Sequence, residues 1–193
     1  MNDPVAASSV ATRPGVFLDR DGTIIVDKGY LKDPDGVTLL AGAPEALLRL
    51  QNAGYALVVI TNQSGIGRGY FGHGAVRRQH ARLRALLDQY GVHIDAVEYC
   101  PHAPDEKCAC RKPEPAMILR AAAKLKLDLK RSYMVGDKTG DVIAGRRAGC
   151  RTILLGDAGT ADADVHSSDL AGAAAWILSE TIPMRREVAH ESD

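Results

Sequence analysis

The segment VFLDRDGTII (residues 16–25) decides the fold class of this chain. Its apolar start stops at Asp19, and Gly22 then permits the sharp turn that ends a buried strand. A second run, ALVVITN (56–62), is continuously apolar and β-branched, as expected of a strand buried on both faces. Both runs end in polar residues, which predicts an open α/β sheet with a ligand site beyond the strand ends.

The rest of the chain continues this alternation of strands and helices. Further strands are predicted at 97–100, 132–137 and 151–156. Apolar periodicity, with glycine or proline at the ends, predicts helices over 44–54, 75–90, 115–127, 141–149 and 170–179. The apolar stripe expected to bury the second of these helices is made of Val76, Leu83, Leu86, Leu87 and Tyr90. Such alternation indicates a Rossmann-like, doubly wound parallel sheet with helices on both faces.

Length and composition limit the classes of protein to which this chain can belong. The chain has 193 residues, 46% of them hydrophobic, with 24 basic and 24 acidic residues. This favours one globular domain over 15–180 with loose ends at 1–14 and 181–193, and it excludes a largely disordered chain. A net charge of zero gives no overall reason to bind nucleic acid or an anionic membrane. With no secretory start and no apolar run of about 20 residues, we expect a cytoplasmic protein. No long apolar stripe outside the predicted helices calls for a partner, so we expect a monomer.

Carboxylates gather at two predicted strand ends. Asp19 and Asp21 follow the first strand, and Asp137 and Asp141 follow the fourth. Carboxylates this close repel one another unless a cation or a proton lies between them. Oxygen ligands of this kind suit Mg²⁺, and a carboxylate can also act as a nucleophile towards phosphorus. From these residues alone, a magnesium site with phosphoryl chemistry and a set of ordinary acidic loop residues at strand ends both stay open.

A cysteine and histidine cluster forms the second chemical feature. The segment 100–110 has the pattern C-x-H-x5-C-x-C, with the candidate ligands Cys100, His102, Cys108 and Cys110. Three thiols and an imidazole make a closed tetrahedral set for Zn²⁺, so we expect a structural zinc loop that aims Arg111 and Lys112 at the acidic centre. Cys150 lies beside an apolar strand and is expected to be a buried apolar residue. A non-enzymatic alternative stays open, in which this loop is a zinc knuckle that contacts nucleic acid.

The order of motifs over residues 16–156 resembles the haloacid dehalogenase-like (HAD) phosphohydrolases. The matching elements are DxDGT (19–23), Thr61, RKP (111–113) and GDxxxD (136–141). The resemblance implies that Asp19 is the nucleophile and Asp21 the general acid and base. It also implies that Thr61 and Lys112 contact the phosphoryl group.

The same resemblance implies how magnesium is held. Its ligands would be Asp19, the main-chain oxygen of Asp21, and Asp137. Asp141 would orient a loop or Lys138. Residues 24–43 are too few for a large cap domain, so the site is expected to be open.

Two loops narrow the resemblance to one group of HAD phosphatases. DKGYL (27–31) and TNQSGIGRGYF (61–71) resemble the heptose-1,7-bisphosphate 7-phosphatases, which act in surface polysaccharide synthesis, more than the related histidinol-phosphate phosphatases. The resemblance implies a sugar bisphosphate substrate and contacts from Asp27, Lys28, Gly29, Tyr30, Asn62, Gln63, Ser64, Arg111 and Lys138. A second dianion also calls for cationic donors, which Arg111 and Arg68 can supply. Histidinol-phosphate phosphatase remains the alternative activity.

Overall fold

A six-stranded parallel sheet forms the centre of the molecule. The computed structural model describes residues 12–156 and 162–181. The strands are β1 (Gly15–Leu18), β2 (Ala56–Asn62), β3 (Ala96–Cys100), β4 (Tyr133–Gly136), β5 (Arg151–Leu155) and β6 (Val165–Ser167). They lie in the order β3-β2-β1-β4-β5-β6 with every pairing parallel. The predicted parallel α/β sheet is thus confirmed, with the short edge strand β6 as an element that the sequence pattern did not predict.

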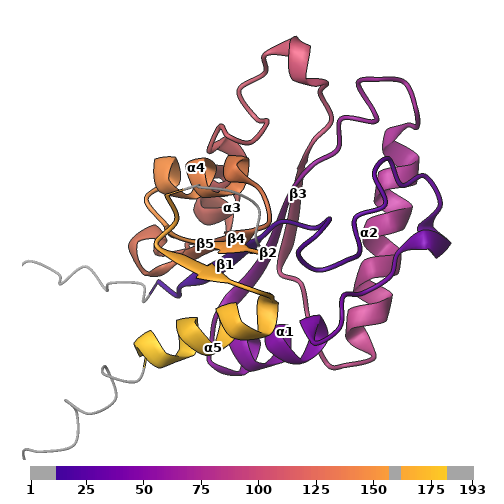
Figure 1. Cartoon of the computed structure of the whole chain (residues 1–193). Coiled ribbons are helices and arrows are strands. Elements are labelled where there is room, and N and C mark those ends of the chain that lie inside the picture. Colours follow the sequence, from indigo (N-terminus) through magenta and orange to yellow (C-terminus); the bar gives the residue numbers. More distant parts are fainter. Residues whose placement is uncertain (1–11, 157–161, 182–193) are drawn as a thin grey trace, which may run out of the picture.

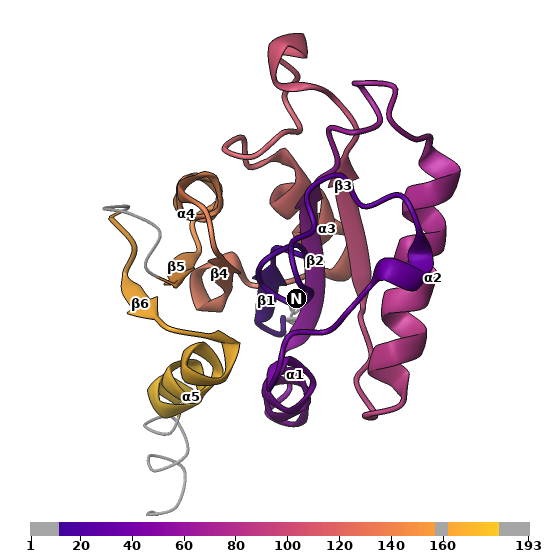
Figure 2. The same ribbon diagram turned by 45° about the vertical axis from the view of Figure 1, so that its right-hand side comes forward.

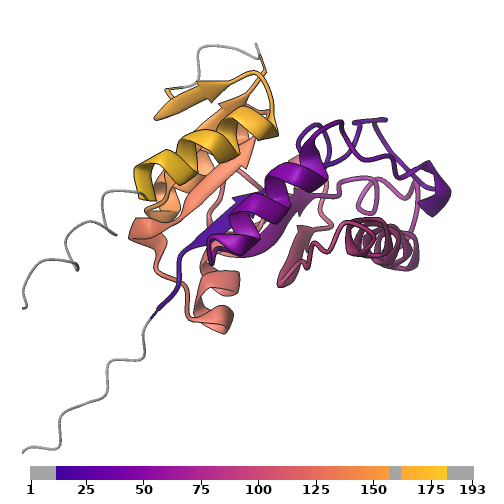
Figure 3. The same cartoon turned by 90° about the horizontal axis from the view of Figure 1, so that it is seen from below.

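Helices cover both faces of this sheet. They are α1 (Ala43–Asn52), α2 (His73–Asp88), α3 (Ala116–Leu125), α4 (Thr139–Ala148) and α5 (Leu170–Thr181). Short 3₁₀ turns, η1 (Pro34–Gly36), η2 (Pro104–Glu106) and η3 (Leu129–Arg131), lie in the connections. Figure 1 and Figure 2 show α1 and α5 side by side on one face, with α3 and α4 on the other. Seen from below, α2 runs along the β3 edge (Figure 3).

The alternation of side chains along β1 and β2 explains the two layers. Val16 and Leu18 point into the core beneath α1 and α5, whereas Phe17 points into the core beneath α3 and α4. Successive side chains of a strand point to opposite faces, so a strand buried on both faces needs an unbroken apolar run. Leu57 and Val59 fill the first core, and Val58 and Ile60 fill the second. The apolar character of 56–62 therefore follows from the central position of β2.

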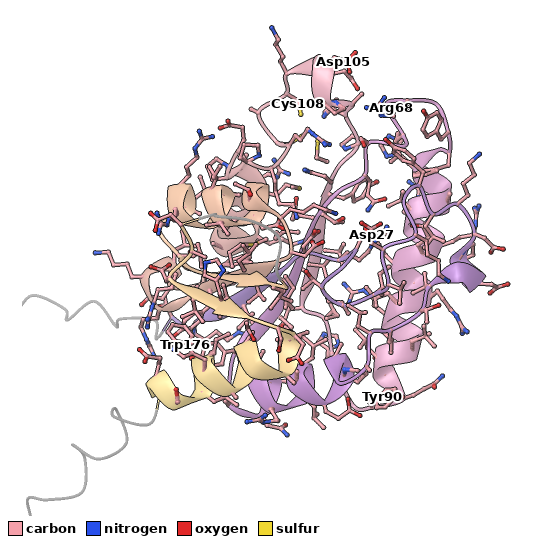
Figure 4. All side chains as sticks on the ribbon, in the orientation of Figure 1. Asp27, Arg68, Tyr90, Asp105, Cys108 and Trp176 are labelled. Carbon is pink, nitrogen blue, oxygen red and sulfur yellow. The ribbon has the colours of Figure 1, made fainter. Side chains whose placement is uncertain are left out.

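The end of the helix predicted over 75–90 differs from the structure. The 75–90 helix was expected to bury Tyr90, but α2 ends at Asp88 and Tyr90 is 48% exposed. Figure 4 shows Tyr90 at the end of the molecule opposite to Arg68 and Cys108. The stripe is correct as far as Leu87, since Val76, Leu83 and Leu87 are buried, and Gly91 then ends the pattern in a turn.

The predicted ends of the domain fall mostly outside the described residues. Residues 1–11 and 182–193 lie outside them, as do 157–161. Within the predicted 1–14 segment, Arg13 pairs with Leu127 in an isolated parallel bridge and forms an ion pair with Asp95. The described helices include none with the length and apolarity that a membrane crossing requires.

Candidate active site

Two glycines allow the carboxylates of the acidic centre to approach one another. Gly22 has a φ of +82°, and a Cβ built there would lie 2.3 Å from Asp137 Oδ2. A Cβ on Gly136 would lie 2.2 Å from Asp141 Oδ2. Side chains at either position would occupy the space of a carboxylate, so glycine is needed at both. The strand ends β1 and β4 are neighbours in the sheet, and this brings the two predicted acidic pairs into one site.

Lys112 lies at the centre of this site. Its Nζ is 2.8 Å from Asp19 Oδ1 and 2.6 Å from Asp141 Oδ1, and it donates a hydrogen bond to the Ile60 carbonyl at 2.7 Å. Burial alone would lower the pKa of Lys112, but the two carboxylates outweigh it and raise that pKa. The side chain therefore remains an ammonium group. The sequence pattern placed Lys112 at the phosphoryl group and did not predict its pairing with Asp141.

Asp141 also supports the turn at the start of α4. Its Oδ2 accepts a hydrogen bond from the Lys138 backbone N–H at 3.0 Å, in the manner of a helix cap. Burial raises the pKa of Asp141 to about 6, although Lys112 counteracts it. The carboxylate thus links the Lys138 turn to the Lys112 ammonium.

Three carboxylates leave room for a divalent cation. One oxygen from each of Asp19, Asp137 and Asp141 can be chosen so that all lie within 4.8 Å of one another. Asp137 Oδ1 is buried and has no hydrogen-bond partner among the described residues. Burial raises the pKa of Asp137, since it disfavours the charged form. Because Lys112 supplies one buried positive charge against three carboxylates, the donor set fits a divalent, oxygen-preferring ion.

The Asp21 carboxylate faces the same cavity from the turn after β1. Its Oδ2 accepts hydrogen bonds from Arg20 Nε at 3.0 Å and from Gln63 Nε2 at 3.2 Å. Gln63 Nε2 also donates to Thr61 Oγ1 at 2.9 Å. Burial raises the pKa of Asp21 and the Arg20 guanidinium counteracts it. This combination suits a group that must both hold and release a proton.

A cavity of about 520 Å³ collects most of the predicted substrate contacts. Its lining includes all of them except Lys28, namely Asp27, Gly29, Tyr30, Asn62, Gln63, Ser64, Arg111 and Lys138. Lys28 instead donates to the Gly36 carbonyl at 2.8 Å and to Thr38. Asn62 holds the Lys112 backbone at both its N–H and its carbonyl, with distances of 3.0 and 3.1 Å. Its amide therefore positions the lysine as well as lining the cavity.

Aromatic and charged side chains form the rim of this cavity. The Tyr30 and Tyr70 rings meet edge to face at 4.7 Å, and the Arg68 guanidinium lies 6.0 Å from the Tyr30 centroid. Asp27 accepts a hydrogen bond from Lys138 Nζ at 3.1 Å. Figure 4 shows Arg68 and Asp27 on the same side of the molecule as Cys108. The rim is therefore built from three separate loops without a cap domain.

The cysteine and histidine cluster is assembled in the structure. The three sulfur atoms lie 3.3–3.4 Å apart, and His102 Nδ1 is 3.3 Å from Cys110 Sγ and 3.5 Å from Cys100 Sγ. Tetrahedral zinc, with Zn–S bonds of about 2.3 Å, would place sulfurs about 3.8 Å apart, so four such ligands fit around one ion with a small expansion. Cys150 is 7% exposed within the apolar core, as predicted.

The loop with this cluster contacts both sides of the cavity. Gln63 N–H donates to the Cys100 carbonyl at 2.7 Å, and Gly67 N–H donates to the Pro101 carbonyl at 2.8 Å. A Cβ on Gly67 would lie 2.5 Å from the Ala103 nitrogen, so the two loops pack backbone to backbone. The loop 100–110 thus supports the 63–71 turn in addition to Arg111 and Lys112.

Curated relatives identify the family. A Haemophilus ducreyi protein named D-glycero-beta-D-manno-heptose-1,7-bisphosphate 7-phosphatase is 43% identical over 150 residues, which cover 74% of this chain and 82% of that protein. A Helicobacter pylori (strain J99) protein of the same name is 42% identical, covering 76% and 84%. The chain belongs to the heptose-1,7-bisphosphate 7-phosphatase family. The resemblance predicted from the motifs is therefore confirmed.

Structural comparison agrees with membership of the heptose bisphosphate phosphatases. A crystal structure of D,D-heptose 1.7-bisphosphate phosphatase from B. bronchiseptica, complexed with magnesium and phosphate, has a TM-score of 0.80 and 35% identity. The match covers 86% of this chain and 99% of that one. A family model described as HAD-hydrolase-like matches residues 109–179. The HAD-type fold class is thus confirmed as well.

Some residues of this heptose bisphosphate phosphatase site were not predicted from the sequence. Arg20 and Gln79 contact the Asp21 region from beneath, and Gly65, Phe71 and Gly140 line the cavity. Arg20 occupies the position marked x in the DxDGT motif, and Gln79 lies near the middle of α2. A polar residue flanked by Val76 and Leu83 on the apolar stripe was the available signal for Gln79, because a buried amide needs a partner.

Proposed function

We propose that this chain removes the 7-phosphate of D-glycero-D-manno-heptose 1,7-bisphosphate and releases the heptose 1-phosphate. The relatives above carry this activity in their names. The product would be a precursor of nucleotide-activated heptose, which is used for surface polysaccharide such as the lipopolysaccharide core. The observation that carries the proposal is the buried Asp19 carboxylate, held 2.8 Å from Lys112 at the base of a cavity lined by Arg111 and Lys138.

Asp19 is the proposed nucleophile. One of its carboxylate oxygens forms a bond to phosphorus as the bond between phosphorus and the C7 oxygen breaks. Asp21 gives its proton to the departing alkoxide, so the sugar leaves as an alcohol. Lys112 and the Thr61 hydroxyl stabilise the phosphoryl oxygens, since this chemistry depends on positioning and charge compensation.

The second half of the reaction regenerates the enzyme. Asp21, now ionised, accepts a proton from a water molecule whose oxygen attacks phosphorus. The bond between phosphorus and the Asp19 oxygen breaks, and inorganic phosphate leaves. Burial raises the pKa of Asp21 while Arg20 counteracts it, which supports a carboxyl that changes protonation state in each turnover.

Magnesium is the proposed resident cation of the acidic centre. Asp19, Asp137 and the Asp21 main-chain oxygen would hold it, supported by the unpartnered Asp137 Oδ1. When bound, Mg²⁺ supplies a positive charge that offsets carboxylate and phosphate repulsion. Zinc is the proposed occupant of Cys100, His102, Cys108 and Cys110, where a closed ligand set has a structural role.

Arg111 is the proposed ligand of the 1-phosphate, which is not hydrolysed. It follows Cys110 directly and lines the cavity, and its Nη1 reaches the His102 carbonyl at 3.5 Å. Lys138 and Asp27 would contact the sugar portion, together with Tyr30 and Ser64. These cations support a bisphosphate over histidinol phosphate, whose ammonium group would be repelled here. We also propose that the chain is a monomer in the cytoplasm and that it binds no nucleic acid.

Phosphate release from three substrates in parallel tests this function. The substrates are the α and β anomers of the heptose bisphosphate and histidinol phosphate, each with Mg²⁺. We expect at least one heptose anomer to give the highest kcat/KM, and the Asp19→Asn variant to release no phosphate from any of them. Faster turnover of histidinol phosphate would overturn the substrate assignment, and an active Asp19→Asn variant would overturn the nucleophile.

A further inference from the structure

Arg20 is an unusual residue for the interior of a small domain. It is 1% exposed and has the largest volume among the fully buried side chains of the described residues. A charged group removed from water is costly unless its hydrogen bonds and counter-charge are supplied in the interior. The neighbouring Asp21 carboxylate supplies both, through Nε to Oδ2 at 3.0 Å and Nη2 to Oδ1 at 3.1 Å. The guanidinium thus holds the two carboxylate oxygens in a fixed plane.

Gln79 holds the opposite side of the same guanidinium. Its Oε1 accepts a hydrogen bond from Arg20 Nη1 at 2.9 Å, and the residue is fully buried. Its Nε2 donates to the Leu31 carbonyl at 2.7 Å, with Lys32 O at 3.4 Å. Each group of the Gln79 amide is therefore occupied, which fixes the orientation of the amide. A continuous path of hydrogen bonds runs from Asp21 through Arg20 and Gln79 to Leu31.

The path joins the acidic centre to two distant elements. Gln79 lies in the second turn of α2, and Leu31 ends the DKGYL segment that lines the cavity through Asp27 and Tyr30. Asp21 itself is only partly enclosed, with its side chain 14% exposed. Without a partner on its inner side, a carboxylate at the cavity edge would sample several rotamers. Proton transfer requires one of them, because a displacement of about 1 Å can cost about 100-fold in rate.

We propose that Arg20 and Gln79 are positioning residues that hold the Asp21 carboxyl in line with the leaving oxygen of the substrate. This inference rests on the proposed function and adds two side chains that do not touch the substrate. Gln79 fixes the guanidinium, and the guanidinium fixes Asp21. Gln63 provides a second, weaker contact at 3.2 Å from the cavity side, so Asp21 is held from both sides.

The choice of leaving group allows an experiment to distinguish a positioning role of Arg20 and Gln79 from a role in stability alone. An alkyl phosphate releases a strongly basic alkoxide, which needs the proton of Asp21 as it leaves. The nitrophenolate of 4-nitrophenyl phosphate is a weak base and leaves without that proton. The ratio kcat/KM reports steps up to the formation of the Asp19 phosphoester, so it isolates the step in which Asp21 acts as an acid.

The test compares Gln79→Met with the wild-type chain, both with Mg²⁺, on three phosphate esters. These are the heptose bisphosphate, glycerol 2-phosphate and 4-nitrophenyl phosphate. We expect kcat/KM to fall on the order of 10- to 100-fold for both alkyl esters and less than about threefold for the aryl ester. Gln51→Met is the matched control, since Gln51 also ties a helix to a loop, through the Gly91 carbonyl and the His93 N–H, but lies outside the cavity lining.

Each outcome decides the question. An equal loss on all three esters, or no loss on any, overturns the inference. Should Gln79→Met fail to fold by circular dichroism, Arg20→Lys takes its place under the same criterion, because one ammonium cannot reproduce the fork that grips both carboxylate oxygens. A wild-type chain that hydrolyses glycerol 2-phosphate and not the heptose bisphosphate contradicts the proposed function while leaving the positioning test intact.

Discussion

Lys112 shows how much one residue must do in this site. It is buried between the proposed nucleophile Asp19 and Asp141, and its backbone is held by the Asn62 amide. The predicted zinc loop, residues 100–110, precedes Lys112 in the chain, and Lys112 Nζ reaches the carbonyl of Ile60 in β2. A buried ammonium in this position offsets the negative charge of two carboxylates at short distance, which no neutral side chain can do.

Removing the Lys112 ammonium is expected to destabilise the chain. Lys112→Met leaves two buried carboxylates facing each other, at a cost of about 3–5 kcal/mol in unfolding free energy. Adding Asp141→Asn should recover part of this loss, because one of the repelling charges is removed. Urea denaturation of the single and double variants measures both effects. A double variant less stable than Lys112→Met would contradict this account.

A comparison of alanine substitutions at Gly22 and Gly54 distinguishes the effect of backbone strain from the effect of a steric contact with Asp137. Gly22→Ala places a methyl group 2.3 Å from Asp137 Oδ2, whereas Gly54, with a φ of +92°, has open space around its Cβ position. Both alanine variants should lose about 1–2 kcal/mol from positive φ. Phosphatase activity should fall at least tenfold in Gly22→Ala alone, because only there is a proposed magnesium ligand displaced. Equal activity in both variants would contradict the tight packing described here.

At the scale of elements, residue type at strand ends predicted which side chains lie together better than helical pattern predicted the ends of the helices. Asp19, Thr61 and Asp137 were identified because polar residues after an apolar run must meet at one sheet edge. The partner of each side chain was harder to predict. The Lys112–Asp141 pair joins positions 29 residues apart in the sequence, and its formation depends on how α4 docks. Arg20 gave the ordinary signal of an exposed charge, although the fold buries it.

The metal-binding loop is expected to depend on its ligands as a unit. Cys108→Ser should lower the zinc content of the purified chain from about one ion to near zero, because three ligands hold a structural zinc far less tightly than four. Cys150→Ala should leave that content unchanged, since Cys150 is not one of the four side chains whose ligand atoms lie within 4.8 Å of one another. Elemental analysis measures both. Zinc retained by Cys108→Ser would contradict the assigned ligand set.

Loss of the loop's metal should affect the cavity before the sheet. Gly67 and Gln63 depend on the carbonyls of Pro101 and Cys100 for their backbone hydrogen bonds, while the core beneath α1 and α5 contains no side chain from 100–110 among the described residues. We expect Cys108→Ser to keep its far-ultraviolet circular dichroism and to show faster proteolysis within 100–110. A full loss of circular dichroism would mean that the metal holds the whole domain together.

For the whole molecule, the sequence was sufficient to predict the fold class but not the order of the strands in the sheet. Alternation of strands and helices implies a parallel sheet, and this is what the structure contains. The order β3-β2-β1-β4-β5-β6 follows from which crossovers pack on which face, and that is decided by long-range packing. Edge strand β6 has only three residues, so its pattern was too short to distinguish from a loop.

The stability of the whole domain should depend on pH through His80. This residue is 8% exposed beside the Tyr99 ring, and its Nε2 has no hydrogen-bond partner among the described residues. Burial, with further contributions from Arg20 and Arg84, lowers the pKa of His80 to about 3. The folded chain therefore keeps this imidazole neutral at pH values where the unfolded chain, with its ordinary pKa near 6.5, takes up a proton.

The sign of the effect follows from this difference in bound protons. Between about pH 6.5 and pH 3 the unfolded state binds more protons at this site, so the unfolding free energy falls as the pH falls. At pH 4.5 the loss is roughly 2–3 kcal/mol relative to pH 7. His80→Phe keeps a ring against Tyr99 and cannot titrate. The unfolding free energy of the variant should therefore rise relative to that of the wild type as the pH falls from 7 to 4.5. The expected relative gain is the same roughly 2–3 kcal/mol. Urea titrations at both pH values measure it, with His93→Gln at an exposed position as the control for loss of a histidine. A difference that stays constant with pH would mean that His80 takes up its proton equally in the folded and the unfolded chain, and Arg20 would then have to tolerate a second buried cation beside it at low pH.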